Sequence, residues 1–106
     1  MALYENLTAQ EIGEAVLATQ ERHRQYVEEM TPAWRQEGNR FRGIRNILGI
    51  SLKKIAELMG VSEKVLSKFE RGLSVNRRRM VRQSYLSMIK YIQLKRENVM
   101  LKKLAD

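Results

Sequence analysis

Basic side chains gather in the middle of this chain, where they could bind an anion together. Residues 32–79 hold twelve Lys and Arg against four Glu, a net charge of +8. Residues 1–31 hold two Arg against six Glu (−4), and residues 80–106 carry +4. Lys and Arg bind phosphate and carboxylate groups through charge-assisted hydrogen bonds. The uneven distribution, with a whole-chain charge of +8 and a pI of 10.1, favours a polyanionic partner over a merely solvated charged surface, which is the alternative.

Residues suited to other kinds of chemistry are scarce. The chain has no Cys, which excludes disulfides, thiolate metal sites and cysteine nucleophiles. His23 is the only His and Asp106 the only Asp, so no His–carboxylate dyad or metal cluster can be read. We therefore predict no catalytic residue, no cofactor and no metal, and we expect His23 to be a partly buried helix residue.

Apolar residues make up 43% of the 106 residues, and a single Pro suits a mostly helical domain. No apolar run approaches the roughly 18 residues that span a membrane, and the N-terminus lacks the pattern of a leader. We expect a cytoplasmic protein with no membrane contact.

Helix signals divide the chain into five predicted helices, an all-α fold. Thr8 and Glu11 have the spacing of a capping box and would begin a helix over residues 9–29. Pro32, tolerated at a first helical position after Thr31, would begin a second helix that ends at Gly49. Gly38 and Gly43 would weaken that second helix by about 1 kcal/mol each relative to Ala.

Two short helices and one long helix complete this prediction. Ser51 and Ser62 would cap helices over residues 52–59 and 63–71, which Gly60 and Gly72 would end. Asn76 would cap a final helix that contains no Pro or Gly.

Residues 52–69 meet the packing conditions of a helix-turn-helix unit, in which two helices cross steeply over a short turn. The fifth position must be small, the ninth must tolerate a positive φ, and five others must be apolar. An ordinary helical hairpin is the alternative. The chain has Ala56 and Gly60 at the first two positions, and Ile55, Met59, Val61, Leu66 and Phe69 at the others.

Residues 41–72 resemble the DNA-binding unit of the lambda-repressor-like or Xre family, which includes phage repressors and Cro proteins. The stretches ISLKKIAELMGVS and VLSKFERG carry the resemblance, and FERG matches the family's usual apolar-Glu-x-Gly ending. Leu52 departs from the family, which often has a Gln there that touches the DNA backbone, and Leu58 is apolar at a usually exposed place. We expect the extra terminal helices to cover both side chains.

Four side chains project from the first turns of the second short helix, at places that the resemblance assigns to base contacts. Lys64 or Lys68 would meet guanine acceptors, Glu63 a cytosine amino group, and Ser67 either. For Glu63 the alternative is a charge that complements the helix dipole.

Phosphate contacts are predicted where cations crowd the positive end of a helix dipole, because a bound anion would resolve the conflict. Solvation of these charges is the alternative. Arg42 and Arg45 are weaker candidates, since either could only flank the core. The predicted phosphate-contacting residues are Ser51, Lys53, Lys54, Arg71, Asn76, Arg77, Arg78 and Arg79.

Apolar side chains outside this unit predict contacts between chains. A four-three spacing from Val81 to Val99 would suit a dimer seam, although packing onto the domain's own core is favoured for the part from Val81 to Ile89. The acidic first helix would pack across the dimer or bind another protein. The predicted dimer or partner residues are Ile12, Val16, Tyr26, Val27, Ile92 and Val99.

These features predict a sequence-specific double-stranded DNA-binding transcriptional regulator, nucleoid-associated and homodimeric on an inverted-repeat operator. The resemblance implies a repressor of bacterial, phage or mobile-element type, whereas charge and geometry imply DNA binding. One alternative is an antitoxin-like protein that binds a partner through residues 9–30 and regulates its own operon. Another is a DNA-binding accessory factor for recombination or replication. The expected organisation is an acidic N-terminal helix (1–31), a DNA-binding domain (32–92) and a C-terminal helix extension (93–106).

Overall fold

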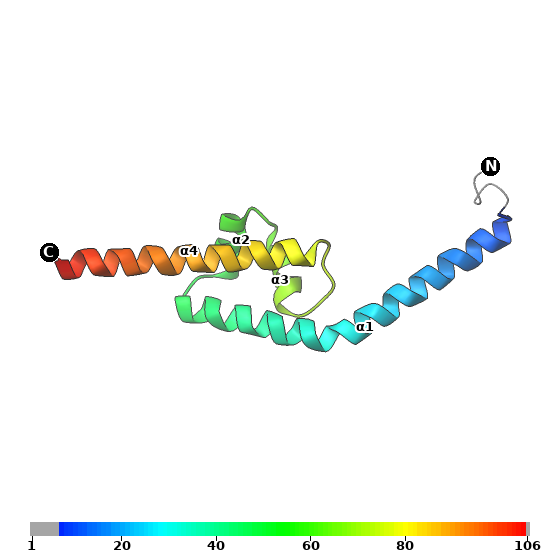
Figure 1. The fold of residues 1–106 in the computed structure, drawn as a ribbon, viewed down its shortest axis with the longest axis horizontal. Helices are drawn as coiled ribbons and strands as arrows, with labels where there is room; N and C mark the ends of the chain where they lie inside the picture. Colours follow the sequence, from blue (N-terminus) through cyan, green and yellow to red (C-terminus); the bar gives the residue numbers. More distant parts are fainter. Residues whose placement is uncertain (1–6, 106) are drawn as a thin grey trace.

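The computed structural model describes residues 7–105, and every regular element within that range is an α-helix. The order is α1 (Ala9–Leu48), α2 (Leu52–Met59), α3 (Glu63–Glu70) and α4 (Arg78–Ala105), as Figure 1 shows. Residues 1–6 of the predicted N-terminal segment and Asp106 lie outside the described residues. The predicted all-α class is confirmed, but four helices take the place of the predicted five.

The difference in number arises at Pro32, which lies inside α1. The predicted break there is wrong: Thr31 Oγ1 donates to the carbonyl oxygen of Val27 (2.6 Å) and does not cap a new helix. Proline removes one backbone hydrogen bond and crowds the carbonyl four residues earlier, which bends a helix without having to end it. Figure 1 shows this bend in the cyan part of α1.

The other helix ends lie close to their predicted residues because each carries its own local signal. Thr8, Ser51 and Ser62 each accept the backbone N–H three residues later at 3.1 Å. Gly49 and Gly60 end α1 and α2 in the left-handed conformation, with φ of 70° and 71°. This conformation favours glycine, which has no Cβ to clash.

The predicted cap at Asn76 is wrong. Asn76 lies in the turn before α4, and Arg77 takes a left-handed φ of 54° immediately before the helix begins at Arg78. A non-glycine residue in this region carries a local strain of about 1 kcal/mol.

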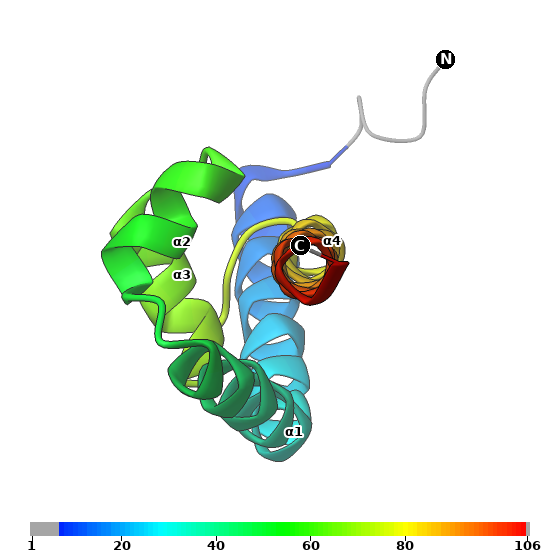
Figure 2. The same cartoon turned by 90° about the vertical axis from the view of Figure 1, so that its left-hand side faces the viewer.

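The core forms where the second half of α1 meets α2, α3 and the first half of α4. In Figure 2, α4 is seen end-on with α2 and α3 to one side of it. Three aromatic rings pack together, with centroids 5.4 Å apart for Phe41–Phe69 and 4.7 Å for Phe41–Tyr85. The buried apolar residues are Phe41, Ile55, Ala56, Leu66, Phe69, Val81, Tyr85 and Ile89.

A buried ion pair joins three of the helices inside this core. The guanidinium of Arg45 on α1 binds both carboxylate oxygens of Glu70 on α3, at 2.8 and 3.0 Å. Tyr85 of α4 donates its hydroxyl to the same carboxylate at 2.6 Å, and Arg45 also donates to the carbonyl of Ile50 at 2.9 Å. The side chains of Arg45 and Glu70 are 11% and 5% exposed. The polar groups satisfy one another, as burial requires.

Close approach of α1 and α3 depends on Gly38, which is buried at their contact. A Cβ added at Gly38 would lie 2.3 Å from the backbone oxygen of Glu70. Gly38, expected only to weaken its helix, therefore contributes to packing.

Both long helices extend beyond this core at opposite ends, over a molecule 76 Å long. We call residues 9–30 of α1 the acidic arm and residues 93–105 of α4 the basic tail. Arg78, the first residue of α4, bonds the carbonyl of Trp34, and Arg96 bonds that of Leu48, the last residue of α1. These two bonds join the second half of α1 to the first two thirds of α4. No described helix is both long enough and apolar enough to cross a membrane.

Candidate functional site

The packing expected of the α2–α3 pair is confirmed at all seven positions. Met59 and Val61 are half-buried against the core, and Gly60 has the required positive φ. The remaining four are at most 2% exposed: Ile55, Ala56, Leu66 and Phe69. One side of α3 is thus sealed, and its other side faces outward.

The four predicted base-contacting residues lie on that outward side. Glu63 and Lys64 are exposed in the first turn of α3, whereas Ser67 and Lys68 are half-buried one turn later. Neither lysine forms an ion pair with any residue between 7 and 105. Two free cations and a hydroxyl on one helix side can donate hydrogen bonds to an external acceptor.

The N-terminus of α2 presents a second group of donors. Ser51 caps it, and Lys53 and Lys54 are exposed in its first turn. Lys54 has one weak partner, Glu57, at 3.9 Å, and both side chains are about 60% exposed. Such a pair contributes little and leaves the lysine available to an anion.

Three other predicted phosphate-contacting residues, Asn76, Arg77 and Arg71, lie near α3. Asn76 and Arg77 line a shallow pocket with Ser62, the cap of α3. Arg71 is exposed at the other end of α3, and its Nε donates to the carbonyl of Ser67 at 3.3 Å. Arg77 and Arg71 therefore lie near the two ends of α3.

Arg78 does not belong with these surface cations. The prediction that Arg78 contacts a phosphate is corrected, because its side chain is bound inside the domain. Its side chain is 12% exposed, and its guanidinium lies 4.4 Å from the centre of the Phe69 ring and 5.0 Å from that of Trp34. It donates to the carbonyls of Trp34 and Leu73 and lies 3.5 Å from a carboxylate oxygen of Glu37. Desolvation lowers the pKa of this guanidinium. Arg78 fastens α4 to α1.

Arg79 and the two weaker candidates also have distinct surroundings. Arg79 is exposed but lines a pocket with Trp34 and Glu37, on the α1 side of the molecule. Arg42 is exposed, whereas Arg45 belongs to the buried ion pair, where the hydrogen bond to Glu70 raises its pKa. For Arg45, the alternative of flanking the core is confirmed.

Sequence reasoning missed the internal role of Glu70 and Tyr85. The FERG stretch pointed to Glu70 as part of a familiar ending, but its partners come from α1 and α4. Burial and the hydrogen bond to Glu70 raise the pKa of Tyr85. The available signal was the position of Glu70, which follows Phe69 and lies four residues after Leu66, on the apolar side of its helix.

Two expectations about burial were wrong. His23 is exposed, because the acidic arm has no neighbour within the described chain at that point. Leu52 packs against the core, but Leu58 remains 45% exposed and is not covered by a terminal helix.

The predicted dimer or partner residues are on the projecting ends. Val27 and Ile92 are half-buried near the domain. Four others are about half exposed: Ile12 (49%), Val16 (50%), Tyr26 (52%) and Val99 (50%). In contrast, Val81, Tyr85 and Ile89 are buried in the chain's own core. For this part of α4, core packing was the favoured alternative to a dimer seam.

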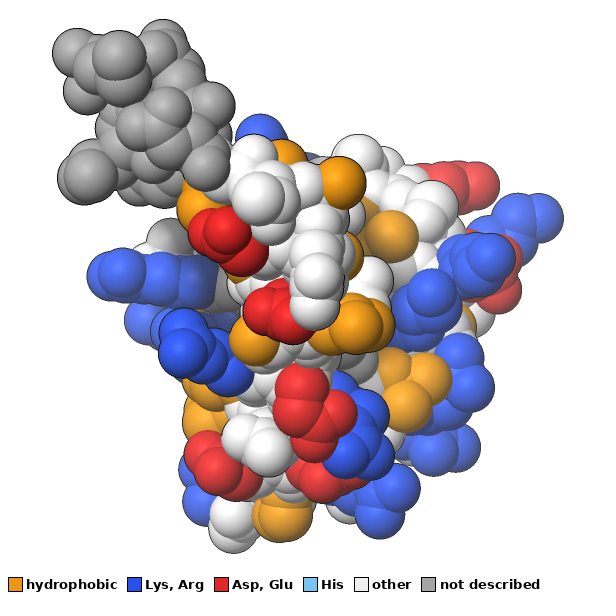
Figure 3. All heavy atoms as spheres, turned by 90° about the vertical axis from the view of Figure 1, so that its right-hand side faces the viewer, with side chains coloured by type: hydrophobic (Ala, Val, Ile, Leu, Met, Phe, Trp, Pro, Cys, Tyr) orange, Lys and Arg blue, Asp and Glu red, His pale blue; other side chains and the backbone are white. Residues whose placement is uncertain are grey.

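Figure 3 shows the charges from the end at which the acidic arm points toward the viewer. Most of the Glu side chains lie down the middle of this view, and Lys and Arg lie mainly on its two flanks. The separation of charge along the sequence is therefore also a separation in space.

Over residues 7–105, no group of three His, Asp or Glu side chains could hold a metal ion. Searches of protein-family models, of curated proteins and of solved structures each found no match to this chain.

Proposed function

We propose that this protein binds double-stranded DNA in a sequence-specific way and regulates transcription, as a homodimeric repressor. In this proposal the α2–α3 pair is a helix-turn-helix unit and α3 is its recognition helix. The observation that carries the proposal is the two-sidedness of α3. Leu66 and Phe69 are fully buried on one side, while Lys64 and Lys68 on the other have no partner among the described residues.

The outward side of α3 has the chemistry to read base edges. Lysine donates to the two acceptors of guanine, serine can donate or accept, and a glutamate accepts from the amino group of cytosine. All three types occur within two turns of α3, at Glu63, Lys64, Ser67 and Lys68. An eight-residue helix with such residues at its N-terminal end is suited to the major groove.

Cations around α3 would hold it against the backbone. Lys53 and Lys54 lie beside free N–H groups at the start of α2, so a phosphate there meets both the charges and the helix dipole. Arg71 and Arg77 flank α3 at its two ends. Arg78 is left out because its charge is used inside the domain.

Selection of bound DNA from a random pool tests the proposal directly. We expect enrichment of an inverted repeat, because one recognition helix reads only one half-site and a homodimer reads two. Absence of any enriched sequence would contradict it.

Two variants separate base reading from backbone binding on the selected sequence. Lys68→Ala is expected to lose about 1–3 kcal/mol on the selected site and little on unrelated DNA. Lys53→Ala is expected to weaken both alike and to reduce the slope of log K against log salt by about one.

Lys90→Ala serves as the control, since Lys90 is an exposed lysine on α4 outside both groups. It removes the same charge and should change neither preference nor slope appreciably. If Lys68→Ala and Lys53→Ala have identical effects on selected and unrelated DNA, the division of roles is wrong. Arg78→Ala is unsuitable for this comparison, because the loss of its contacts would destabilise the domain.

A second candidate is an antitoxin-like protein whose acidic arm binds a partner protein. The observation that favours it is the exposure of Ile12, Val16 and Tyr26 on a helix segment that projects from the domain. Co-purification of a stoichiometric partner that is a different protein from this chain, and that is lost on Val16→Glu, would support this role.

A further inference from the structure

Each long helix carries its core-facing side beyond the core. On α1, helical spacing places Ile12, Val16 and Val27 on the same side as Phe41, which is buried. On α4, steps of seven residues connect Tyr85, also buried, with Ile92 and Val99. The acidic arm and the basic tail therefore each continue a buried stripe into solvent.

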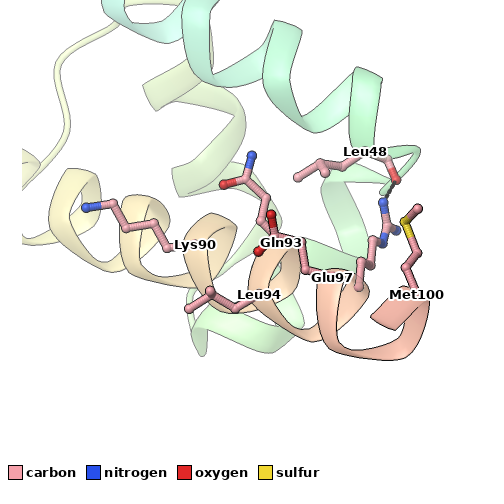
Figure 4. A pocket seen from close by; sticks show the side chains of 7 residues that line it. Leu48, Lys90, Gln93, Leu94, Glu97 and Met100 are labelled. Atoms are coloured by element: carbon pink, nitrogen blue, oxygen red, sulfur yellow. Dashed lines mark hydrogen bonds between the residues drawn. The ribbon is translucent and has the colours of Figure 1, made fainter. Parts of the chain in front are cut away.

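The basic tail offers a groove for another helix. Arg96 donates to the carbonyl of Leu48 (2.7 Å), so α1 ends at this level and the tail beyond it has no neighbouring helix within residues 7–105. A shallow, mainly apolar depression is lined there by Ile92, Lys95, Arg96, Val99 and Met100. Figure 4 shows the adjoining pocket, where Leu48 lies over α4 while Gln93 and Met100 reach toward α1.

Charge selects what can occupy this groove. The acidic arm holds five Glu and two Arg, a net charge of −3. The basic tail holds four Lys and Arg and one Glu, a net charge of +3. Pairing two arms or two tails would bring like charges together, whereas pairing an arm with a tail brings opposite charges together.

The arm and the tail of one chain cannot meet, because they leave the domain at opposite ends of the long axis (Figure 1). α1 and α4 run in the same general direction along that axis. A two-fold axis perpendicular to the long axis would lay the arm of each chain antiparallel to the tail of the other, at both ends. Such an arrangement closes after two chains.

We propose that two copies of this chain pair by reciprocal exchange, the acidic arm of each lying along the basic tail of the other. The seam buries Ile12, Val16 and Val27 against Ile92, Val99 and Met100, with Lys95 facing the acidic arm and Arg96 lining the groove while it bonds Leu48 of its own chain. This deepens the homodimer part of the proposed function and does not require DNA binding.

Cross-linking tests the pairing, since the chain has no Cys of its own. We would make Val16→Cys and Val99→Cys separately and treat them with a flexible bismaleimide, alone and as an equimolar mixture, without DNA. The arm–tail seam predicts a strong cross-link in the mixture and little in either variant alone. Gln25→Cys, on the opposite side of the arm, mixed with Val99→Cys, is the matched control and should cross-link several-fold less.

Any other distribution of cross-links among these samples contradicts the proposal. Cross-linking of Val16→Cys alone would indicate arm–arm pairing, and cross-linking of Val99→Cys alone would indicate tail–tail pairing. Circular dichroism checks that each variant is folded, which is expected because both positions are about half exposed.

Light scattering of the unmodified protein, again without DNA, provides a second measurement. We expect twice the chain mass at tens of micromolar, and a return to the single-chain mass for Val16→Glu, which adds a charge to the apolar stripe. A monomer in the unmodified protein would exclude the exchanged pair, and a mass that keeps growing with concentration would indicate open head-to-tail chains. DNA selection that fails while the mixture cross-links would reject the proposed function and leave the pairing intact.

Discussion

The centre of the molecule and its two ends use the same helices under different conditions. Within α1, Phe41 is 9% exposed, whereas Val16, on the same side of the helix, is 50% exposed. Within α4, Tyr85 is fully buried, whereas Val99 is half exposed. One amphipathic pattern thus runs through both regions, and the presence of neighbouring helices decides whether it contributes to stability.

Two ion pairs make the same contrast in electrostatics. Arg24 and Glu21, in the acidic arm, are 2.6 Å apart with side chains 64% and 49% exposed. Arg45 and Glu70, in the core, are 2.8 Å apart with side chains 11% and 5% exposed. The two pairs have similar distances but contribute differently to stability. Water screens the exposed pair, so its contribution is small. In the buried pair, removal of one partner leaves the other charge buried without compensation.

The largest expected effect comes from breaking the buried pair. Glu70→Ala should lower the free energy of unfolding by about 3–5 kcal/mol, because it leaves Arg45 buried without its partner. Glu21→Ala, the matched change in the acidic arm, should leave the urea midpoint unchanged. Similar midpoints for the two variants would show that burial does not distinguish these regions.

Tyr85→Phe should cost about 1.5–3 kcal/mol at neutral pH, the range for a hydrogen bond to a charged group. It should also change how stability depends on pH. The pKa of Tyr85 is raised in the folded state, so its contribution is complete below the unfolded value near 10 and is lost as the pH rises above it.

Urea unfolding of both proteins between pH 8 and 11 measures this dependence. The unmodified protein should lose stability more steeply than Tyr85→Phe above about pH 10. Parallel curves would contradict the buried environment of this hydroxyl.

Gly38→Ala should destabilise the protein by about 1–3 kcal/mol, as overpacking does, because the added Cβ would lie 2.3 Å from a backbone oxygen of α3. Backbone atoms on both helices leave little room for adjustment. Thermal unfolding followed by circular dichroism gives the difference, and an unchanged midpoint would place α1 and α3 further apart.

The smallest effect is expected at Gly13, a glycine of the same helix with no atom within 4 Å of an added Cβ. Gly13→Ala should increase helix content in the acidic arm, with a gain of at most about 1 kcal/mol from helix propensity. Far-ultraviolet circular dichroism at low temperature measures the change. A loss of helix signal would mean that the arm has a close contact at Gly13.

The helix ends were predictable because their causes lie within one turn of the chain. Ser51 and Ser62 accept N–H groups three residues ahead, and Gly49 and Gly60 take the left-handed conformation that a helix end favours. Pro32 was not predictable in the same way. A proline can start a helix or bend one, and here the helix continues through it to reach the core.

For the candidate site, the periodicity of the apolar residues in α3 was enough to predict which side of this helix faces outward. The role of Arg78 did not follow, because its partners Trp34 and Glu37 lie about forty residues earlier in the chain. Three consecutive arginines look alike in sequence, yet Arg77 lies near α3, Arg78 lies against the core, and Arg79 faces the α1 side.

The sequence by itself determined the helical class, the helix ends that carry caps, the sealed side of the α2–α3 pair and the separation of acidic from basic segments. These depend on residues close together in the chain or on composition. Only the tertiary structure decided that Glu70, Arg45 and Tyr85 form one buried network, that Arg78 is withdrawn from the surface, and that two apolar stripes continue past the core. Burial is set by distant neighbours, and it decides whether a charge or an apolar side chain faces water.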